Sequence, residues 1–341
     1  MQVPYWNDET ATLYAADPLQ VLAELSDRSA DCIVTSPPPW TPPQDAKQPA
    51  QRLGAEPTAA LYLASLRRVL AQAHRVLTDQ GTAWLITSDR YTDQTASALH
   101  LAGRHRRRIP DPAMAGMPAA SLIGLPWQLA FALQDDGWVI RNAIVWHHSA
   151  TEPHPADERF PRSYELIFLL VKTGRYYFDS AAAHQSFDRL AETGDPASAN
   201  LLSTQLGALR GGWRRLRKQA CRHGIPRQAR AIASCRPRHC AASGSQRPRM
   251  LQVLPFGVAG DVWALPARPQ RHTLPVEVPL RCIAAGCRPG GTVLDVFAAT
   301  GTTGIAARRL GRSFIGIEPD VELCRIAEHR LSGNDHASGL A

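Results

Sequence analysis

One stretch near the C-terminal end constrains the fold more than any other part of this chain. Residues 292–294 have the apolar character of a short buried strand, residues 299–304 form a tight turn of small residues, and residues 305–310 begin a helix. A second strand is expected over residues 313–317, and Glu318 follows it directly. A strand, turn, helix and strand in this order predict a β-α-β unit, and therefore an α/β fold with a mostly parallel sheet.

The turn and the acidic residue of this unit are typical of a ligand site. In such units the backbone amides at a helix N-terminus approach the ligand, and an acidic residue about 20 positions on accepts hydrogen bonds from ribose hydroxyls. Glu318 has the position of that acid, and Ala299-x-Gly301-x-x-Gly304 resembles a dinucleotide fingerprint whose first glycine is replaced. These residues alone fit a nicotinamide, a flavin or a nucleoside-type cofactor.

A second stretch, near the N-terminal end, stops a strand abruptly. Residues 31–35 have the character of a buried strand that runs directly into Ser36-Pro37-Pro38-Pro39-Trp40. Each proline lacks an N–H and fixes φ, so the chain must leave the sheet rigidly at its carboxyl edge. Open α/β sheets bind their ligands at that edge. Taken alone, the stretch fits either a proline-rich loop with no chemistry or a rigid turn that offers a hydroxyl and carbonyls to the protons of an exocyclic amine and an aromatic face to a base flipped out of a duplex.

Together the two stretches resemble the amino-methyltransferases of DNA. The motifs of that family are a D/N/S-P-P-Y/F/W stretch and a D-P-F-x-G-x-G-T-T stretch, and here the motif at Ser36 precedes the motif at Asp295. This is the permuted order of the group often called beta, and the resemblance covers most of the chain outside residues 185–255. It implies a Rossmann-like S-adenosylmethionine-dependent methyltransferase fold, a mixed and mostly parallel sheet with helices on both faces, plus a basic inserted target-recognition region.

The resemblance also implies roles for individual residues. Ser36 Oγ and the Pro37 carbonyl would grip the amine protons, with Pro38 completing the turn and Trp40 stacking on the ring. The expected cofactor is S-adenosyl-L-methionine, with its amino acid portion near Asp295, its adenine beside Phe297 and its ribose hydroxyls on Glu318. The complete expected cofactor site is Asp295, Phe297, Ala299, Gly301, Thr302, Thr303 and Glu318.

Three positions depart from the family pattern. Val296 replaces a proline and Ala299 replaces a glycine, so a methyl group would crowd the cofactor or strain the backbone if φ must be positive there. Pro39 occupies the aromatic position of the first motif and Trp40 follows it at once, so either Trp40 stacks on the base instead or the working turn is Pro37-Pro38-Pro39-Trp40. These departures leave open a catalytically impaired relative that still binds DNA.

The identity of Ser36 bears on the target base. In the family, serine at this position is more often associated with the cytosine amino nitrogen and aspartate with adenine, so cytosine N4 is favoured and adenine N6 is the alternative. The direct transfer needs no covalent cysteine, and Cys32 is expected in the core. A nicotinamide oxidoreductase, and methylation of RNA or of a small molecule, remain rival functions.

The positive charge of the chain is concentrated in one region. The net charge is +8, yet residues 196–260 contain twelve Arg or Lys and no Asp or Glu. This composition favours a polyanionic partner, and the resemblance implies that the region contacts the phosphates of double-stranded DNA, although a partly unfolded loop would have a similar composition. The cysteines and histidines at 221–240 have no strong zinc spacing, and no metal is expected. The candidate DNA-binding residues are Arg210, Arg214, Arg215, Arg217, Lys218 and Arg222.

These features divide the chain into four expected parts. Residues 1–184 form the catalytic half of the methyltransferase domain, 185–255 the basic insert, 256–332 the cofactor-binding half and 333–341 a flexible tail. A cognate restriction endonuclease is a further partner that the resemblance implies. No apolar run approaches the ~18 residues of a membrane span, and the N-terminus lacks secretory character, so we expect a cytoplasmic protein with no membrane partner.

Apolar periodicity places the remaining elements. The expected helix at 58–77 has Thr58 as its N-cap and buries Leu61, Leu66, Val69, Leu70 and Leu77. Further helices are expected at residues 18–25, 126–134 and 322–331, and strands at 82–87, 138–147 and 165–172.

Overall fold

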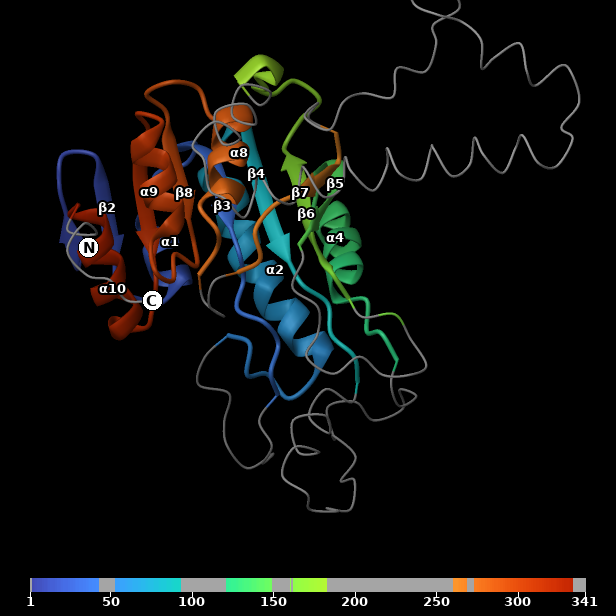
Figure 1. Ribbon diagram of the computed structural model, residues 1–341. Helices are drawn as coiled ribbons and strands as arrows, with labels where there is room; N and C mark the ends of the chain where they lie inside the picture. The colour runs from blue at the N-terminus through green and yellow to red at the C-terminus, as the bar shows by residue number, and fades with distance from the viewer. Residues whose placement is uncertain are drawn as a thin grey trace, which may run out of the picture. The chain divides into compact units, whose positions relative to one another are not determined.

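The computed structural model describes residues 2–42, 53–92, 121–148, 160, 162–182, 260–268 and 273–333. Its strands are β1 (Trp6–Asn7), β2 (Ala11–Tyr14), β3 (Ala30–Thr35), β4 (Leu77–Thr87), β5 (Val139–His147), β6 (Tyr164–Val171), β7 (Val262–Ala264), β8 (Thr292–Asp295) and β9 (Ser313–Ile317). Its helices are α1 (Pro18–Glu24), α2 (Ala59–Val76), α4 (Leu125–Asp135), α8 (Glu277–Gly286), α9 (Thr302–Arg309) and α10 (Val321–Leu331) (Figure 1).

Part of the expectation lies outside these residues. The basic insert at 185–255 is not described, and neither are its six candidate DNA-binding residues or its cysteines and histidines. The same holds for residues 334–341 of the expected tail. The division of the chain into domains therefore stays a prediction.

The described strands form one mixed sheet in the order β1-β2-β9-β8-β3-β4-β6-β5-β7. The pairs β2 with β9, β9 with β8, β8 with β3, β3 with β4, and β5 with β7 are parallel. β6 runs antiparallel to both of its neighbours, and β1 runs antiparallel to β2. The predicted α/β class with a mixed, mostly parallel sheet is confirmed.

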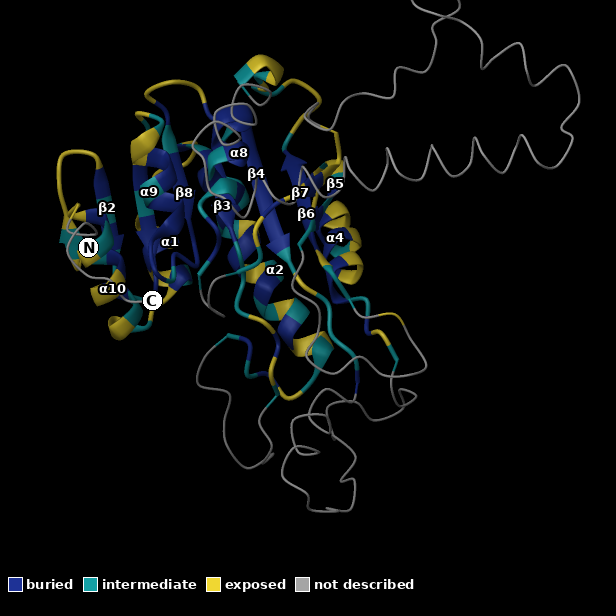
Figure 2. Ribbon diagram, viewed as in Figure 1, coloured by how far each residue is buried: buried dark blue, intermediate teal, exposed yellow. Residues whose placement is uncertain are grey.

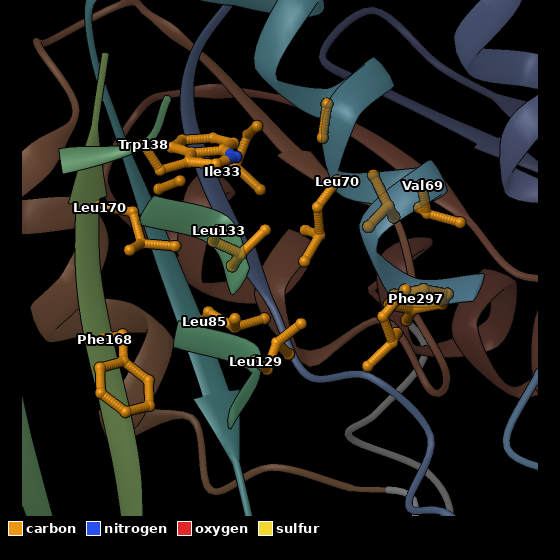
Figure 3. Close-up of a cluster of buried hydrophobic side chains, with 14 of the residues drawn as sticks. Ile33, Val69, Leu70, Leu85, Leu129, Leu133, Trp138, Phe168, Leu170 and Phe297 are labelled. Atoms are coloured by element: carbon orange, nitrogen blue, oxygen red, sulfur yellow. The ribbon is translucent and has the colours of Figure 1, made fainter. Parts of the chain in front are cut away.

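Helices cover both faces of the sheet. α1, α2 and α4 share one apolar core with alternate side chains of the inner strands, among them Ile33, Leu85 and Phe168 (Figure 3). α8 covers the other face of β3 and β4, and α9 and α10 continue that layer. Cys32 points to this second face, where it is fully buried near Thr82, and its predicted place in the core is confirmed. Figure 2 shows the resulting pattern, in which the inner strands are buried, α2 and α4 are exposed on one side, and α8 has no exposed residue.

The predicted boundaries hold within a few residues, with two errors. Thr58 caps α2 by accepting a hydrogen bond from the Leu61 amide at 3.2 Å, as predicted, but the Leu61 side chain is 51% exposed and Tyr62 is buried in its place. β4 begins at Leu77, which was assigned to the helix, because Leu77 already pairs with Ala30 before a register shift in the ladder. Among the described helices, none is both long and apolar enough to cross a membrane.

The strand order reverses next to β3. From β8 the chain passes through α9 to β9 on one side, whereas from β3 it passes through α2 to β4 on the other. Ligands of open α/β sheets bind at the carboxyl ends of the strands beside such a switch point. The two motifs that the sequence singled out follow β3 and β8, the two strands at this point.

The contact of α8 with the sheet depends on Gly286. A Cβ atom added there would lie 2.2 Å from Thr82 Oγ1 and 2.5 Å from Trp84 Nε1, both of which belong to buried side chains. We expect Gly286→Ala to lower the free energy of unfolding by about 1–3 kcal/mol, because the helix must move off the strand. Urea denaturation measures the loss. Gly174→Ala is the control, since nothing lies within 4 Å of its added Cβ; equal stability of the two variants would contradict the expectation.

Candidate active site

A buried hydrogen bond joins the two sequence motifs. The Thr35 hydroxyl at the end of β3 donates to Asp295 Oδ1 at the end of β8 over 2.7 Å. The two strands are parallel neighbours, with Ile33 opposite Leu294. Ser36, the first residue of the proline turn, therefore starts beside the loop that follows Asp295, although 259 positions separate them in the sequence.

Asp295 organises this junction from inside the protein. Its side chain also accepts hydrogen bonds from the Thr303 hydroxyl at 2.7 Å and from the Phe297 amide at 3.1 Å. Burial raises the pKa of Asp295 to about 6, and the three hydrogen bonds act in the opposite direction. The carboxylate thus ties β3, the loop after β8 and the first turn of α9 together. Its predicted place near the amino acid portion of a cofactor stays a prediction.

The loop after β8 contains a left-handed alanine. Ala299 has φ +46°, the conformation at which its replacement of a glycine was expected to strain the backbone. Its amide donates to Glu318 Oε2 at 2.9 Å. Gly301 has φ +76°, and a Cβ there would lie 3.0 Å from the Cβ of Ala327 in α10. Gly301 is therefore required both by its backbone conformation and by the close approach of this turn to α10.

The threonines at the start of α9 bond to the protein itself. Thr303 donates to Asp295, and Thr302 Oγ1 accepts from Arg330 of α10 at 3.0 Å. The same Arg330 nitrogen donates to the Thr300 carbonyl at 2.6 Å, so this arginine braces the whole turn. Sequence reasoning missed Arg330, because it lies about three helical turns beyond Glu318 and follows no motif spacing.

Glu318 lies at the carboxyl end of β9 with acceptor capacity left over. Only 7% of the residue is exposed, and burial raises the pKa of its carboxyl group. Its oxygens accept from the amides of Ala299 and Asp320, at 2.9 and 3.0 Å. A carboxylate offers about four lone-pair sites, so both oxygens can still accept. This chemistry fits ribose hydroxyls and disfavours a phosphate at the same place.

The hydroxyl of Ser36 has a partner that the sequence did not indicate. Arg268, which follows β7, donates from Nη2 to Ser36 Oγ at 3.0 Å. Two further hydrogen bonds, each 2.8 Å long, join Arg268 to both carboxylate oxygens of Glu165 in β6. The guanidinium also lies over the Trp146 ring, 5.5 Å from its centroid. These three residues come from separate segments, so no local pattern connects them with the proline turn.

The rest of the proline turn packs against α2. The Pro38 carbonyl accepts a hydrogen bond from the Tyr62 hydroxyl at 2.8 Å, and burial raises the pKa of Tyr62. Among the described residues, no donor bonds to the Pro37 carbonyl. The Pro37 carbonyl oxygen can therefore still accept a hydrogen bond, whereas the Pro38 carbonyl already accepts one from Tyr62.

Trp40 lies elsewhere than the sequence suggested. A ring face presented for stacking was expected, but Trp40 is only 2% exposed, its Nε1 donates to the Glu56 carbonyl at 2.8 Å and its ring stacks on Tyr62. Burying the apolar ring of Trp40 in the core is more favourable in free energy than exposing it to water. The cavity between the turn, α2 and α4 measures about 20 Å³, room for roughly one water molecule but not for a base. Stacking by Trp40 would require movement of the turn, and that role stays a prediction.

Comparison with known proteins agrees with this geometry. The family model of DNA methylases matches residues 30–329, so the chain belongs to the DNA methylase family of N6 and N4 amino-methyltransferases. Type II methyltransferase M.Cfr9I of Citrobacter freundii is 31% identical over an alignment that covers 95% of this chain and 89% of the relative. M.XycI of Xanthomonas campestris pv. cyanopsidis is 30% identical with the same coverage.

Solved structures share the fold at lower identity. The TTHA0409 protein of Thermus thermophilus, in complex with S-adenosyl-L-methionine, superposes with a TM-score of 0.54 at 20% identity, over 96% of this chain and 95% of that one. The cytosine-N4-specific PvuII DNA methyltransferase gives a TM-score of 0.56 at 14% identity, over 97% and 96%. The predicted Rossmann-like methyltransferase fold is confirmed.

The left-handed conformation of Ala299 predicts a stabilising substitution. Ala299→Gly should raise the free energy of unfolding by about 1 kcal/mol, because relief of ~1–3 kcal/mol of strain outweighs the ~0.4–1 kcal/mol of unfolded-chain entropy that glycine adds. Chemical denaturation measures the change. The neighbouring Ala298, which is buried and is not among the described residues with positive φ, is the control. Ala298→Gly should lower the free energy of unfolding. If Ala299→Gly lowers it as well, the backbone at Ala299 is not strained.

The raised pKa of Asp295 predicts a dependence of stability on pH. Because the folded pKa of about 6 lies above the ordinary value of 3.8, the folded state keeps a proton that the unfolded state releases between these values. The contribution to stability is present below about pH 4 and is lost as the pH rises through 6. We expect the free energy of unfolding of wild type, relative to Asp295→Asn, to fall by roughly 2 kcal/mol from pH 4 to pH 7.

A second aspartate provides the control for this titration. The hydrogen bond from Arg67 lowers the pKa of Asp136, so its contribution is present above its ordinary pKa and lost in acid. Relative to Asp136→Asn, the wild type should therefore gain stability as the pH rises out of the acid range. Differences of the same sign for both aspartates would contradict the assignment at Asp295.

Proposed function

We propose that this DNA methyltransferase transfers a methyl group from S-adenosyl-L-methionine to the exocyclic amine of a flipped base in double-stranded DNA, at N4 of cytosine. The observation that supports the proposal most directly is the Thr35 to Asp295 hydrogen bond. This bond holds the start of the proline turn, which we propose grips the amine, beside the loop proposed to hold the cofactor. The rival oxidoreductase gives the proline turn no role at this junction.

The loop after β8 and the end of β9 would hold the cofactor. Glu318 would accept from the ribose hydroxyls with the lone pairs that Ala299 and Asp320 leave open. Phe297, which is 8% exposed, would contact the adenine ring, and the first amides of α9 would face the ligand. When bound, S-adenosyl-L-methionine supplies a methyl group on a positively charged sulfur, which makes that carbon electrophilic.

The proline turn would prepare the amine for attack. The amine nitrogen of cytosine or adenine is conjugated with its ring, and acceptors that hold its protons localise the lone pair toward the incoming methyl group. Ser36 Oγ is one such acceptor, and the Pro37 carbonyl is the second, since Tyr62 already occupies the carbonyl of Pro38. Pro37 and Pro38 fix the direction of both acceptors by restricting φ.

Cytosine is favoured as the target for one reason. Ser36 gives the first motif its S-P-P form, which within the resembled family is more often associated with cytosine N4. Adenine N6 is the alternative, because adenine offers the same amine beside a ring nitrogen. The arginine-rich insert would bind the DNA phosphates through Arg210, Arg214, Arg215, Arg217, Lys218 and Arg222. A cognate restriction endonuclease is a further proposed partner, because the relatives are named type II methyltransferases.

The base and the activity are tested together. Purified protein is incubated with unmethylated mixed-sequence duplex DNA and labelled S-adenosyl-L-methionine, and the digested nucleosides are identified by mass spectrometry. N4-methylcytosine is expected. N6-methyladenine would retain the mechanism and change the base, whereas absence of transfer despite binding of cofactor and DNA would indicate a catalytically impaired relative.

Removal of the Ser36 hydroxyl tests its role. Ser36→Ala should lower the single-turnover rate of methyl transfer by about 100-fold, because one preorganised partner of the reacting group is lost, while the Kd of the cofactor stays the same. The control is Ser29→Ala at the other end of β3, where the hydroxyl donates to the Ser26 carbonyl in an exposed turn. Wild-type rates in Ser36→Ala would remove Ser36 from the mechanism.

A further inference from the structure

Arg268 follows β7, the edge strand at one end of the sheet, and extends from there to Ser36. β7 pairs with β5, and beyond it the Leu265 amide donates to the His147 carbonyl at 3.1 Å while Trp146 Nε1 donates to the Pro266 carbonyl at 3.2 Å. These contacts fix the backbone two and three residues before Arg268. Glu165, opposite Trp146 in the β5 and β6 ladder, meets the arginine at the same edge.

Both carboxylate oxygens of Glu165 hold the guanidinium. The two hydrogen bonds of 2.8 Å form a bidentate pair, and the Glu165 and Arg268 side chains are only 9% and 21% exposed. Bidentate pairing and the contact with the Trp146 ring leave the guanidinium little freedom to rotate. The donor of its third hydrogen bond, Nη2 toward Ser36, is therefore held in one position.

This third bond restricts what the Ser36 hydroxyl can do. A serine hydroxyl has one proton to donate and two lone pairs to accept with, and it rotates to suit its neighbours. Arg268 occupies one lone pair at 3.0 Å. The O–H cannot point toward Arg268, so the hydroxyl proton takes one of the two remaining directions and the second lone pair takes the other, where it can accept a hydrogen bond from an amine.

Charge sets a further requirement on the pair. The amine nitrogen becomes positive as it bonds to the methyl group, and an uncompensated guanidinium nearby would oppose this change. The carboxylate of Glu165 neutralises Arg268 while leaving its Nη2 hydrogen bond to Ser36 in place. An ion pair can thus orient the serine without adding net charge to the site.

We propose that Arg268, held by Glu165, is a positioning residue that fixes the Ser36 hydroxyl for the target amine. The inference rests on the proposed function and adds to it two residues outside both sequence motifs. On this proposal Arg268 acts on the amine only through its hydrogen bond to Ser36. Its effect must therefore depend on the presence of the Ser36 hydroxyl.

A double-mutant cycle tests this dependence. Single-turnover rates are measured on unmethylated duplex DNA for wild type, Arg268→Lys, Ser36→Ala and the double variant. A lysine retains the charge but cannot pair with both oxygens of Glu165 and reach Ser36 at once. We expect Arg268→Lys to lower the rate about 10-fold with the Kd of cofactor and of DNA unchanged, and to cause no further loss when Ser36 is already alanine.

The control is a second bidentate pair, for which neither partner makes a hydrogen bond to the proline turn among the described residues. Arg67 donates from Nε and Nη2 to the two oxygens of Asp136, at 2.8 and 2.5 Å. Arg67→Lys should keep the wild-type rate. Arg268→Gln, which retains an amide donor, replaces Arg268→Lys if thermal unfolding shows that the lysine variant does not fold.

Several results would overturn the inference. These are a wild-type rate in the Arg268 variant, the same loss in both Ser36 backgrounds, or a loss of DNA or cofactor affinity that equals the loss of rate. If methyl transfer by Ser36→Ala is too slow to measure, the Arg268 variant decides the question, through its loss of single-turnover rate compared with its change in Kd for cofactor and DNA. Absence of transfer by the wild type would refute the proposed function itself and the positioning role with it.

Discussion

The site depends on one buried hydrogen bond, from the Thr35 hydroxyl to the Asp295 carboxylate. Water does not reach it to compete, and it joins the ends of two neighbouring parallel strands. Because Asp295 also accepts from Thr303 and from the Phe297 amide, a single carboxylate fixes the proline turn, the following loop and the start of α9. The pKa of that carboxyl group is raised because burial disfavours its charged form.

Features that depend on near neighbours in the chain were predictable. Alternation, small-residue turns and capping act over a few positions, so the strand at 313–317 was predicted to the residue and Thr58 was placed correctly as a cap. A left-handed alanine at 299 was one of two possibilities raised by its position in the motif, which normally holds glycine. Even the meeting of the two motifs followed from the rule that parallel strands end at one edge of a sheet.

Features set by distant segments were not predictable in this way. Whether Trp40 faces solvent depends on Tyr62 and Glu56, and neither has a fixed spacing from the proline turn. The pairing of Arg268 with Ser36 depends on the register of strands at the other end of the sheet. Single residues that act at long range leave no periodic pattern, so the sequence supplied the motifs but not the side chains that support them.

The place of β3 between β4 and β8 has a consequence for how the protein is made. β4 follows β3 closely in the chain, but β8 is synthesised about 260 residues later. Until then one edge of β3 has unpaired amides and carbonyls, and a pairing over such a long sequence distance forms slowly. The segment through Asp295 must therefore have left the ribosome before the two motifs can meet, and a product that ends before β8 would expose the open strand edge to other chains.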